Sequence, residues 1–201
     1  MKRREFLVAA PIAVASVSVR DAGTLAPNAT ASASSVPETQ LVARDEPGVA
    51  LVVSGAIYGP DGSTPARGVR LFLYHTDAQG YYSYPRDNPR DSRIRGWVTA
   101  NEQGRYRFRT IRPAHYASGW RGAAHIHTHV HAPDAPVHWI DSFLFADDRY
   151  LAKEQRAEGL KLGALSPVMQ VSERGGVAYC TRDIRLEPRL CERNRLVDDW
   201  R

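Results

Sequence analysis

Residues 125–131 read His-Ile-His-Thr-His-Val-His, and this strict alternation constrains the fold more than any other part of the chain. The residues between the histidines are all β-branched and favour strands, in which alternate side chains lie on the same face. His125 and His127 would then stand roughly 6.6 Å apart along the backbone, close enough for two imidazoles to bind one ion. A polar strand face in water is the alternative interpretation. Four histidines at period two favour a metal site.

Turn signals recur at short intervals between apolar runs along the rest of the chain. In one example, Asn101-Glu-Gln-Gly104 precedes residues 105–111, where Tyr106 and Phe108 share one face. Long helical periodicity is missing, and only residues 147–158 are expected to form a short helix. These features predict an all-β fold, an antiparallel β-sandwich. The expected strands are residues 49–58, 69–74, 97–100, 105–111, 125–131, 139–145 and 178–186.

Four segments differ in composition. Residues 1–22 combine Lys2-Arg3-Arg4-Glu5-Phe6-Leu7 with an apolar run too short to span a bilayer, a pattern that resembles a bacterial twin-arginine (Tat) signal. Residues 23–48 are rich in Ala, Ser, Thr and Pro and are expected to be a flexible linker. Residues 49–188 would form the sandwich, and residues 189–201 a C-terminal tail. We therefore expect export to the periplasm or the cell exterior, without a stable membrane anchor.

Charge and cysteine content narrow the class of protein further. The formal net charge is +5, and residues 1–22 contribute four basic and two acidic side chains, so the remainder carries only +3. The arginines are scattered and form no basic stripe with interleaved aromatics, so nucleic acid is not an expected partner. Cys180 and Cys191 are the two cysteines. An oxidising compartment would permit a disulfide between them, and two free thiols are the alternative.

Tyrosine is the second unusual ingredient. Tyr81, Tyr82 and Tyr84 follow Asp77-Ala-Gln-Gly80, and Tyr116 precedes the histidine run. A tyrosine with its ordinary pKa of about 10 is neutral, but a neighbouring trivalent cation stabilises the phenolate. Two phenolates, two neutral imidazoles and one hydroxide around Fe(III) sum to zero charge. A neutral assembly of this kind avoids a large desolvation penalty inside a cleft.

Several segments together resemble the intradiol ring-cleavage dioxygenases, the non-haem Fe(III) enzymes that include catechol and protocatechuate 3,4-dioxygenases. The resemblance covers roughly residues 50–187 and implies a transthyretin-like sandwich. Each segment is weak alone, but the set in this order is specific. The segments are His75-Thr-Asp-Ala-Gln-Gly-Tyr-Tyr-Ser-Tyr84, Arg95-Gly-Trp-Val-Thr99, Gly104-Arg-Tyr-Arg-Phe-Arg-Thr-Ile-Arg-Pro113, Tyr116 and His125-Ile-His127.

The resemblance implies that Fe(III) is bound by Tyr82, Tyr116, His125 and His127. Tyr82 corresponds to the equatorial tyrosinate and Tyr116 to the axial one. Tyr81 is the alternative to Tyr82, because a one-residue slip exchanges the two. The substrates implied are a small aromatic diol and O2, with cleavage between the hydroxyl-bearing carbons to a muconate-type diacid. A bound catechol would displace Tyr116, which takes up a proton.

Three further features bear on this assignment. Arg121 is the arginine that would steady charge developing on the ring, although it lies one residue farther from His125 than is common in the family. Asp141-Ser142 stands where the family often has a glutamine. His129 and His131 have no ligand counterpart, so they would line the cleft or face solvent, and His131 is expected in solvent or at the rim.

Other interpretations stay open. A transthyretin-like sandwich that binds copper or zinc, or a partner, without catalysis is the main one, although such a protein has no use for two phenolates. A cupin oxygenase also uses His-x-His but requires a glutamate soon after it, where this chain has residues 130–133, Val-His-Ala-Pro. Serine hydrolysis lacks a Gly-x-Ser-x-Gly motif. Homo-oligomerisation is left open.

Overall fold

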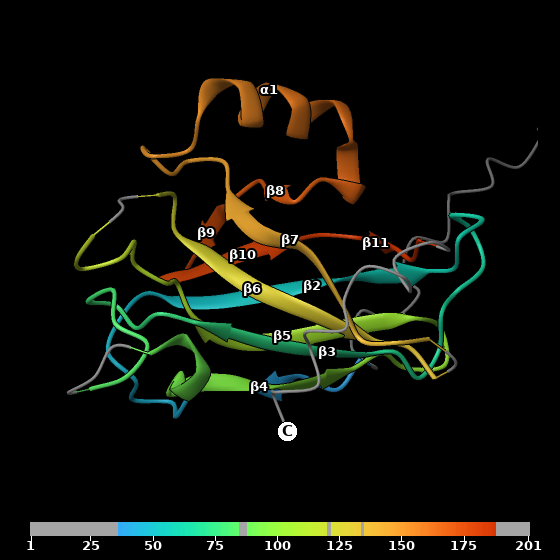
Figure 1. Cartoon of the computed structure of the whole chain (residues 1–201), viewed down its shortest axis with the longest axis horizontal. Helices are drawn as coiled ribbons and strands as arrows, with labels where there is room; N and C mark the ends of the chain where they lie inside the picture. Colours follow the sequence, from blue (N-terminus) through green and yellow to red (C-terminus); the bar gives the residue numbers. More distant parts are fainter. Residues whose placement is uncertain (1–35, 85–87, 120–121, 134, 188–201) are drawn as a thin grey trace, which may run out of the picture. The chain divides into compact units, whose positions relative to one another are not determined.

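The computed structural model describes residues 36–84, 88–119, 122–133 and 135–187. Its strands form two sheets that face each other (Figure 1). The first sheet has six strands: β1 Thr39–Gln40, β2 Ala50–Tyr58, β5 Arg105–Ile111, β9 Ser172–Arg174, β10 Val177–Thr181 and β11 Ile184–Arg185. Its order is β1-β5-β2-β10-β9, and β11 also pairs with β2.

The second sheet carries the histidine run. Its strands are β3 Arg70–His75, β4 Ile94–Thr99, β6 His125–His131, β7 His138–Phe145 and β8 Val168–Met169. The order is β4-β3-β6-β7-β8, so β6 lies at the centre. Figure 1 shows helix α1, Lys153–Lys161, beyond the β7–β8 edge. In the described part of the chain, short 3-10 helices span Pro89–Asp91 and Gly163–Leu165.

The core lies between the two sheets and follows from side-chain alternation. Along β6, Ile126 and Val130 are fully buried in the core, while the histidines between them point to the opposite face of the sheet. Burial of a large apolar side chain stabilises a fold by about 1.5–3 kcal/mol. The largest side chains of this core are Tyr106, Phe108, Phe143, Phe145, Leu51, Ile57, Leu71, Leu73, Ile126 and Met169.

The predicted antiparallel sandwich is correct only in part, because both sheets are mixed. The pairs β1–β5, β2–β10, β2–β11 and β7–β8 are parallel, and the remaining pairs are antiparallel. Side-chain alternation is the same in both kinds of sheet, so the sequence pattern carried no information on direction. Parallel neighbours need a long connection. Here β10 and β11 return to β2 only after the chain has built the other sheet.

Two predicted elements differ from the structure near the C-terminus. The helix expected at 147–158 begins later, as α1 at Lys153, because residues 147–151 form turns. The strand expected at 178–186 is broken into β10 and β11. At the break, the Asp183 carboxylate accepts the N–H of Ala56 at 2.8 Å, so a side chain replaces a backbone partner of β2.

The flexible linker predicted for residues 23–48 extends too far. Its last part, residues 36–48, packs on the sandwich, and we call it the N-terminal strap. Thr39 and Gln40 of the strap pair with β5. Leu41 packs against the core, with its Cδ2 only 2.6 Å from where a side chain at Gly96 of β4 would begin. The strap therefore forms the edge of the first sheet through β1 and packs on the edge strand of the second sheet, β4.

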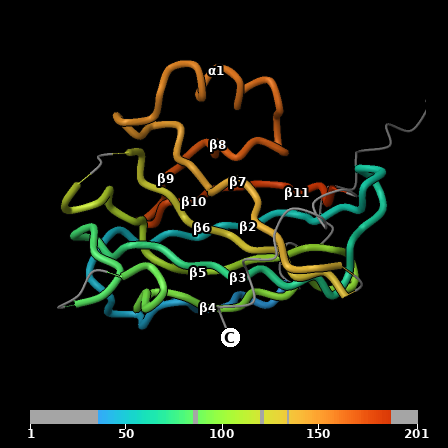
Figure 2. The backbone as a smooth tube through the Cα atoms, in the orientation of Figure 1, coloured from blue at the N-terminus to red at the C-terminus, as the bar shows by residue number. Residues whose placement is uncertain are grey.

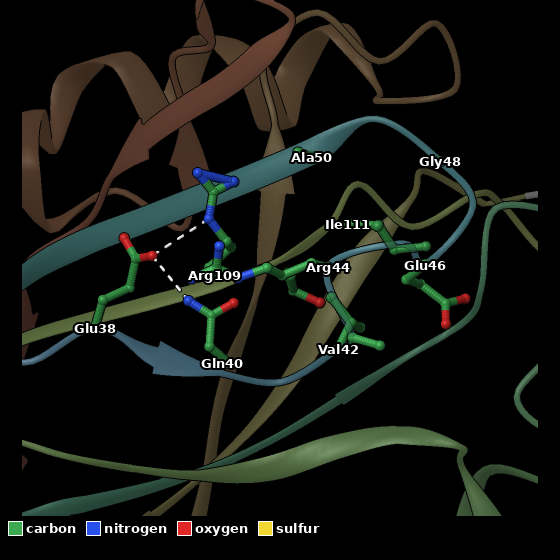
Figure 3. Close-up of a pocket in the computed structure, with 11 residues that line it drawn as sticks. Glu38, Gln40, Val42, Arg44, Glu46, Gly48, Ala50, Arg109 and Ile111 are labelled. Atoms are coloured by element: carbon green, nitrogen blue, oxygen red, sulfur yellow. Dashed lines mark hydrogen bonds and ion pairs between the residues drawn. The ribbon is translucent and has the colours of Figure 1, made fainter.

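A pocket of about 440 Å³ lies under the N-terminal strap (Figure 3). Glu38 pairs with Arg107 and Arg109 of β5, at 2.8 and 3.3 Å, and accepts a hydrogen bond from Gln40. The residues that line the pocket include neither tyrosine nor histidine. Glu38 and Arg109, two of the charged residues of the pocket lining, thus hold the strap to the sheet.

Several predictions fall on parts of the chain that the structure does not describe. These are the signal segment (1–22), the linker up to residue 35, the tail (189–201), Arg121 and Cys191. Cys180 is buried in the core, and its disulfide with Cys191 stays a prediction. Among the described residues, none of the helices combines the length and the apolar character needed to cross a membrane.

Candidate metal centre

Four side chains from three separate segments converge at one end of the second sheet. The Tyr82 Oη lies 2.8 Å from the Tyr116 Oη and 2.8 Å from the His127 Nε2. The Tyr116 Oη is 3.0 Å from the His125 Nε2 and 3.5 Å from the His127 Nε2. The two Nε2 atoms are 3.0 Å apart. Two phenol oxygens and two ring nitrogens therefore point at a common centre.

These separations fit ligands of one metal ion. With bonds of roughly 2 Å, ligand atoms at angles of about 90–120° stand about 2.8–3.5 Å apart, the range seen here. Two bare Nε2 atoms at 3.0 Å gain little from each other unless a proton or a cation lies between them. Within the described residues no three His, Cys, Asp or Glu side chains gather at a point. A metal site here therefore depends on the phenols.

Strand β6 places the two imidazoles. Ile126, between them, is fully buried in the core, so His125 and His127 both project from the other face. The His125 Nδ1–H donates to the Ala123 carbonyl at 2.7 Å, which leaves the Nε2 lone pair free to bind an ion. The His127 Nδ1 has a weaker partner, the Ser142 hydroxyl at 3.4 Å.

The two tyrosines come from loops that leave the same end of the sheets, after β3 and after β5 (Figure 2). The Ala114 N–H donates to the Asp77 carbonyl at 3.1 Å, and the Ala117 N–H to the Gly80 carbonyl at 3.2 Å. The Thr76 hydroxyl donates to the Ala114 carbonyl at 2.6 Å. The loops are thus hydrogen-bonded to each other both before and after Tyr116 in the chain, and this restricts the distance between the two phenols.

Burial keeps both imidazoles neutral, the form that binds metals. The pKa of His127 is lowered to about 3, first by burial and then by the neighbouring His125, His129 and His75. Burial also lowers the pKa of His125, although the nearby Asp148 carboxylate opposes this. Neutral imidazoles offer a lone pair without the repulsion that imidazolium would exert on a cation.

Aromatic rings enclose the site on the sheet side. Tyr74 is buried and stacks on His127, with ring centroids 4.6 Å apart at 18°. Burial raises the pKa of Tyr74, so this phenol stays neutral beside the site. The Trp139 ring contacts His127 edge-on, with ring centroids 5.9 Å apart, and its centroid lies 3.8 Å from that of His129. This wall lowers the local polarity and restricts rotation of His127.

The structure separates the site residues from their neighbours. Tyr81, the alternative to Tyr82, is 40% exposed, whereas Tyr82 is 4% exposed and lies in the cluster. His129, expected at the cleft or in solvent, is buried against Trp139 because the aromatic wall covers it. His131, at the other end of β6, is half-buried and packs edge-on against Trp97 of β4. Arg121, expected to be catalytic, lies outside the described residues.

Two residues near the site were not predicted from the sequence. Tyr74 resembles any apolar strand residue of β3, and only the pairing of Tyr74 with His127 across the sheet reveals its role. Asp148 lies in a turn after β7 and belongs to no recognisable motif, yet its carboxylate reaches the segment that enters β6. The contacts of both residues depend on the fold.

Comparison with known proteins agrees with this architecture. A family model described as "Dioxygenase" matches residues 25–187, most of the chain. A catechol 1,2-dioxygenase from Acinetobacter lwoffii is 36% identical over 81 residues, which cover 39% of this chain and 26% of that protein. The chain belongs to the intradiol dioxygenase family. A hydroxyquinol 1,2-dioxygenase from Rhizobium sp. (strain MTP-10005), of the same family, is 26% identical over 162 residues.

The intradiol dioxygenase match spans only part of the curated relatives. The region aligned with the Rhizobium protein is 67% of this chain and 55% of that protein. Among solved structures, the dioxygenase domain of a carbohydrate-binding fusion protein from Streptomyces sp. SirexAA-E is 29% identical, with a TM-score of 0.57 over 78% of this chain and 91% of that one. Catechol 1,2-dioxygenase from Pseudomonas arvilla C-1 shares the fold at a TM-score of 0.60 and 22% identity, over 81% of this chain and 62% of that one.

Proposed function

We propose that this intradiol dioxygenase homologue is a non-haem Fe(III) enzyme that uses O2 to cleave a catechol-type aromatic between its hydroxyl-bearing carbons, yielding a muconate-type diacid. The convergence of two phenol oxygens and two imidazole Nε2 atoms within 3.5 Å carries this proposal. Relatives named for the cleavage of catechol, hydroxyquinol and chlorocatechol support the substrate class.

The donor set suits Fe(III) better than copper or zinc. Phenolate oxygens are hard, anionic donors that a trivalent ion stabilises, and imidazoles also bind iron. Tyr82, Tyr116, His125 and His127 would hold the ion. Bound Fe(III) would supply the Lewis acidity that activates a catecholate towards O2. Two phenolates also offset two of the three positive charges, which suits a partly buried site.

The two tyrosines differ in their surroundings, and this assigns them different roles. Tyr82 is 4% exposed and contacts both the other phenol and His127, so it serves as a fixed ligand. Tyr116 is only half-buried and is thus the more accessible of the two phenols. Tyr116 is therefore the phenol that takes up a proton from an incoming catechol. Tyr74 and Trp139 exclude water from the sheet side of the site.

Arg121 completes the proposal on sequence grounds. In this assignment its guanidinium stabilises negative charge that develops on the aromatic ring. Its place before His125 in the chain supports the role, as does the resemblance to the family motif. Replacement of Arg121 by Met should lower kcat and leave the amount of bound iron nearly unchanged, because the guanidinium acts on the substrate and not on the ion.

Optical spectroscopy tests the ligand set directly. The purified chain loaded with Fe(III) should show a tyrosinate-to-Fe(III) charge-transfer band that shifts when catechol is added. Tyr82→Phe and Tyr116→Phe should each weaken or shift the band, because each removes one phenolate. Tyr81→Phe is the matched control, since Tyr81 is an exposed neighbour outside the cluster. Formation of a muconate-type product, followed by its ultraviolet absorbance, should accompany the wild-type band.

The same measurements separate the alternative function. A colourless protein that retains one equivalent of zinc and cleaves no catechol would favour a metal-binding module without catalysis. An unchanged band in both Tyr82→Phe and Tyr116→Phe would refute the ligand assignment. A loss of the band in Tyr81→Phe would place the ligand one residue earlier.

We further propose that the protein is exported through the Tat pathway. The twin arginines Arg3 and Arg4 and the short apolar stretch after them support this. Tat export carries folded proteins, which suits a chain that binds its metal before export. Cell fractionation should find the wild-type protein outside the cytoplasm and an Arg3→Lys/Arg4→Lys variant inside it. Equal distribution of the two would argue against this route.

A further inference from the structure

One peptide group joins the metal centre to a buried carboxylate. The Ala123 carbonyl accepts the Nδ1–H of His125 at 2.7 Å. The N–H of the same peptide group, that of Ala124, donates to the Asp148 Oδ2 at 3.1 Å. The two bonds run in one direction, from imidazole to carbonyl and from amide to carboxylate. Hydrogen bonds in such a chain polarise and strengthen one another.

The Asp148 carboxylate is available for this role because its hydrogen-bond donors are backbone amides. It is 9% exposed, and its Oδ1 accepts the N–H of Tyr150, at 2.8 Å. Among the described residues no Lys, Arg or His forms an ion pair with it. Arg112 pairs through two hydrogen bonds of 2.7 Å with Asp147 instead, and the Arg156 guanidinium donates to the Asp148 backbone carbonyl at 3.0 Å. A buried carboxylate held by amide donors places its negative charge on those amides.

We propose that Asp148 is a positioning residue that fixes the ring orientation of His125 and increases electron density at its Nε2 through the Ala123–Ala124 peptide group. Metal-bound histidines are commonly oriented by a carboxylate that accepts the Nδ1–H directly. Here the peptide group is inserted between the two, and its own dipole continues the chain of hydrogen bonds. This inference rests on the proposed function only in that His125 binds a metal.

The arrangement makes the two imidazoles unequal. His125 has a carboxylate behind its Nδ1–H, whereas the His127 Nδ1 meets only the neutral Ser142 hydroxyl at 3.4 Å. An imidazole whose Nδ1–H is polarised by an anion is the better electron donor at Nε2. His125 therefore binds the ion more strongly than His127, and loss of Asp148 should matter more to the site than loss of the Ser142 hydroxyl.

Asp148→Asn removes the charge at nearly constant size, and Asp147→Asn is the matched control. Both changes remove one carboxylate, but Asp147 is 49% exposed and contacts the Arg112 side chain. Fe(III) and Zn(II) affinities would be measured for each purified, metal-free protein by competition with a chelator. Asp148→Asn should lower both affinities by about 10- to 100-fold, the usual effect of removing an outer partner of a metal ligand. Asp147→Asn should stay within about threefold of wild type, and Ser142→Ala should lower both affinities less than Asp148→Asn does.

The charge-transfer band separates an electronic role from a structural one. At saturating iron, a weaker His125 donor leaves Fe(III) a better electron acceptor, so the band of Asp148→Asn should move to longer wavelength. Misfolding alone would reduce the amount of bound iron without such a shift, and thermal unfolding of the metal-free proteins would reveal it. Equal affinities and band positions in Asp148→Asn and Asp147→Asn would overturn the inference.

The zinc titration keeps this outcome distinct from the proposed function. If the wild-type chain binds zinc but forms no coloured Fe(III) complex, the dioxygenase proposal fails while Asp148 is still tested through its effect on zinc affinity. A coloured wild-type complex combined with unchanged Asp148→Asn behaviour would retain the dioxygenase and remove the role of Asp148. Failure of the wild-type chain to bind either metal would overturn both.

Discussion

At the residue scale, His75 should make the stability of the metal-free protein depend on pH. It is fully buried at the end of β3, with its Nδ1 2.7 Å from the Thr76 carbonyl and its Nε2 2.8 Å from the Thr110 hydroxyl. Burial lowers the pKa of His75 to about 4. The histidine pKa is about 6.5 in the unfolded chain. Between pH 6.5 and 4 the imidazole is therefore protonated in the unfolded chain and neutral in the folded one. Stability is full above pH 6.5 and falls as the pH drops towards 4, by about 3 kcal/mol for this residue.

Urea unfolding of wild type and His75→Gln between pH 7.5 and 4 measures this contribution. The variant should be less stable at pH 7.5, because glutamine does not reproduce the two hydrogen bonds that the imidazole makes with the Thr76 carbonyl and the Thr110 hydroxyl. Its stability should fall less steeply with decreasing pH, by up to about 1.4 kcal/mol per pH unit between pH 6.5 and 4. His125, His127, His129 and His131, whose pKa values burial also lowers, contribute to the slope that remains. Equal slopes in the two proteins would contradict this interpretation.

At the scale of elements, Gly80 sets how closely the two tyrosine loops approach. Its φ is +91°, and a Cβ at this position would lie 2.2 Å from the His115 carbonyl oxygen and 2.7 Å from the Ala117 nitrogen. Gly80→Ala must therefore move the Tyr116 loop as well as adopt a strained backbone. We expect a loss of about 2–4 kcal/mol in unfolding free energy and at least a tenfold loss of iron affinity.

Gly175→Ala is the control for backbone strain alone. Gly175 also has a positive φ, +57°, but a methyl group at this position would meet open space, with nothing beyond its chain neighbours within 4 Å in the described part of the chain. This variant should lose only about 1 kcal/mol and keep its iron affinity. Chemical denaturation and chelator competition measure the two quantities. Equal effects of the two substitutions on iron affinity would show that the Tyr116 loop does not depend on Gly80.

Prediction of the elements from the sequence succeeded where burial alternates and failed where it does not. The bounds expected for residues 105–111 and 125–131 are those of β5 and β6, because each strand has one buried and one polar face. The two-residue strands β1 and β8 are too short to show a period. The parallel pairing of β2 with β10 depends on the path of the whole chain, which no local pattern contains.

At the scale of the whole molecule, the candidate site was predictable only as far as its motifs reach. Tyr82, Tyr116 and the His-x-His pair each stand in a recognisable sequence context, and the fold brings them together. Asp148 and Tyr74 have no such context. Each reaches the site through a contact across the tertiary structure, Asp148 with Ala124 and Tyr74 with His127. Residues that support a site can therefore be identified only once the fold is known, although they help to set the geometry of the site.

The N-terminal strap provides a test of how the whole sandwich holds together. Leu41 packs between the core and Gly96 of β4, while the strap backbone pairs with β5 of the other sheet. Leu41→Ala should lower the unfolding free energy by about 2 kcal/mol, the low end for leucine truncation because the side chain is only partly buried. Leu160→Ala, at a leucine of α1 that is 62% exposed, should change it by less than about 0.5 kcal/mol.

Urea unfolding followed by tryptophan fluorescence and by far-ultraviolet circular dichroism distinguishes two ways in which the strap can act. If the strap closes the edge between the sheets as part of one cooperative unit, both probes should report the same shifted midpoint for Leu41→Ala. The slope of free energy against urea should stay constant, because the same surface is exposed on unfolding. An early transition seen by one probe alone, or equal effects of Leu41→Ala and Leu160→Ala, would mean that the strap lies on the sandwich without stabilising it.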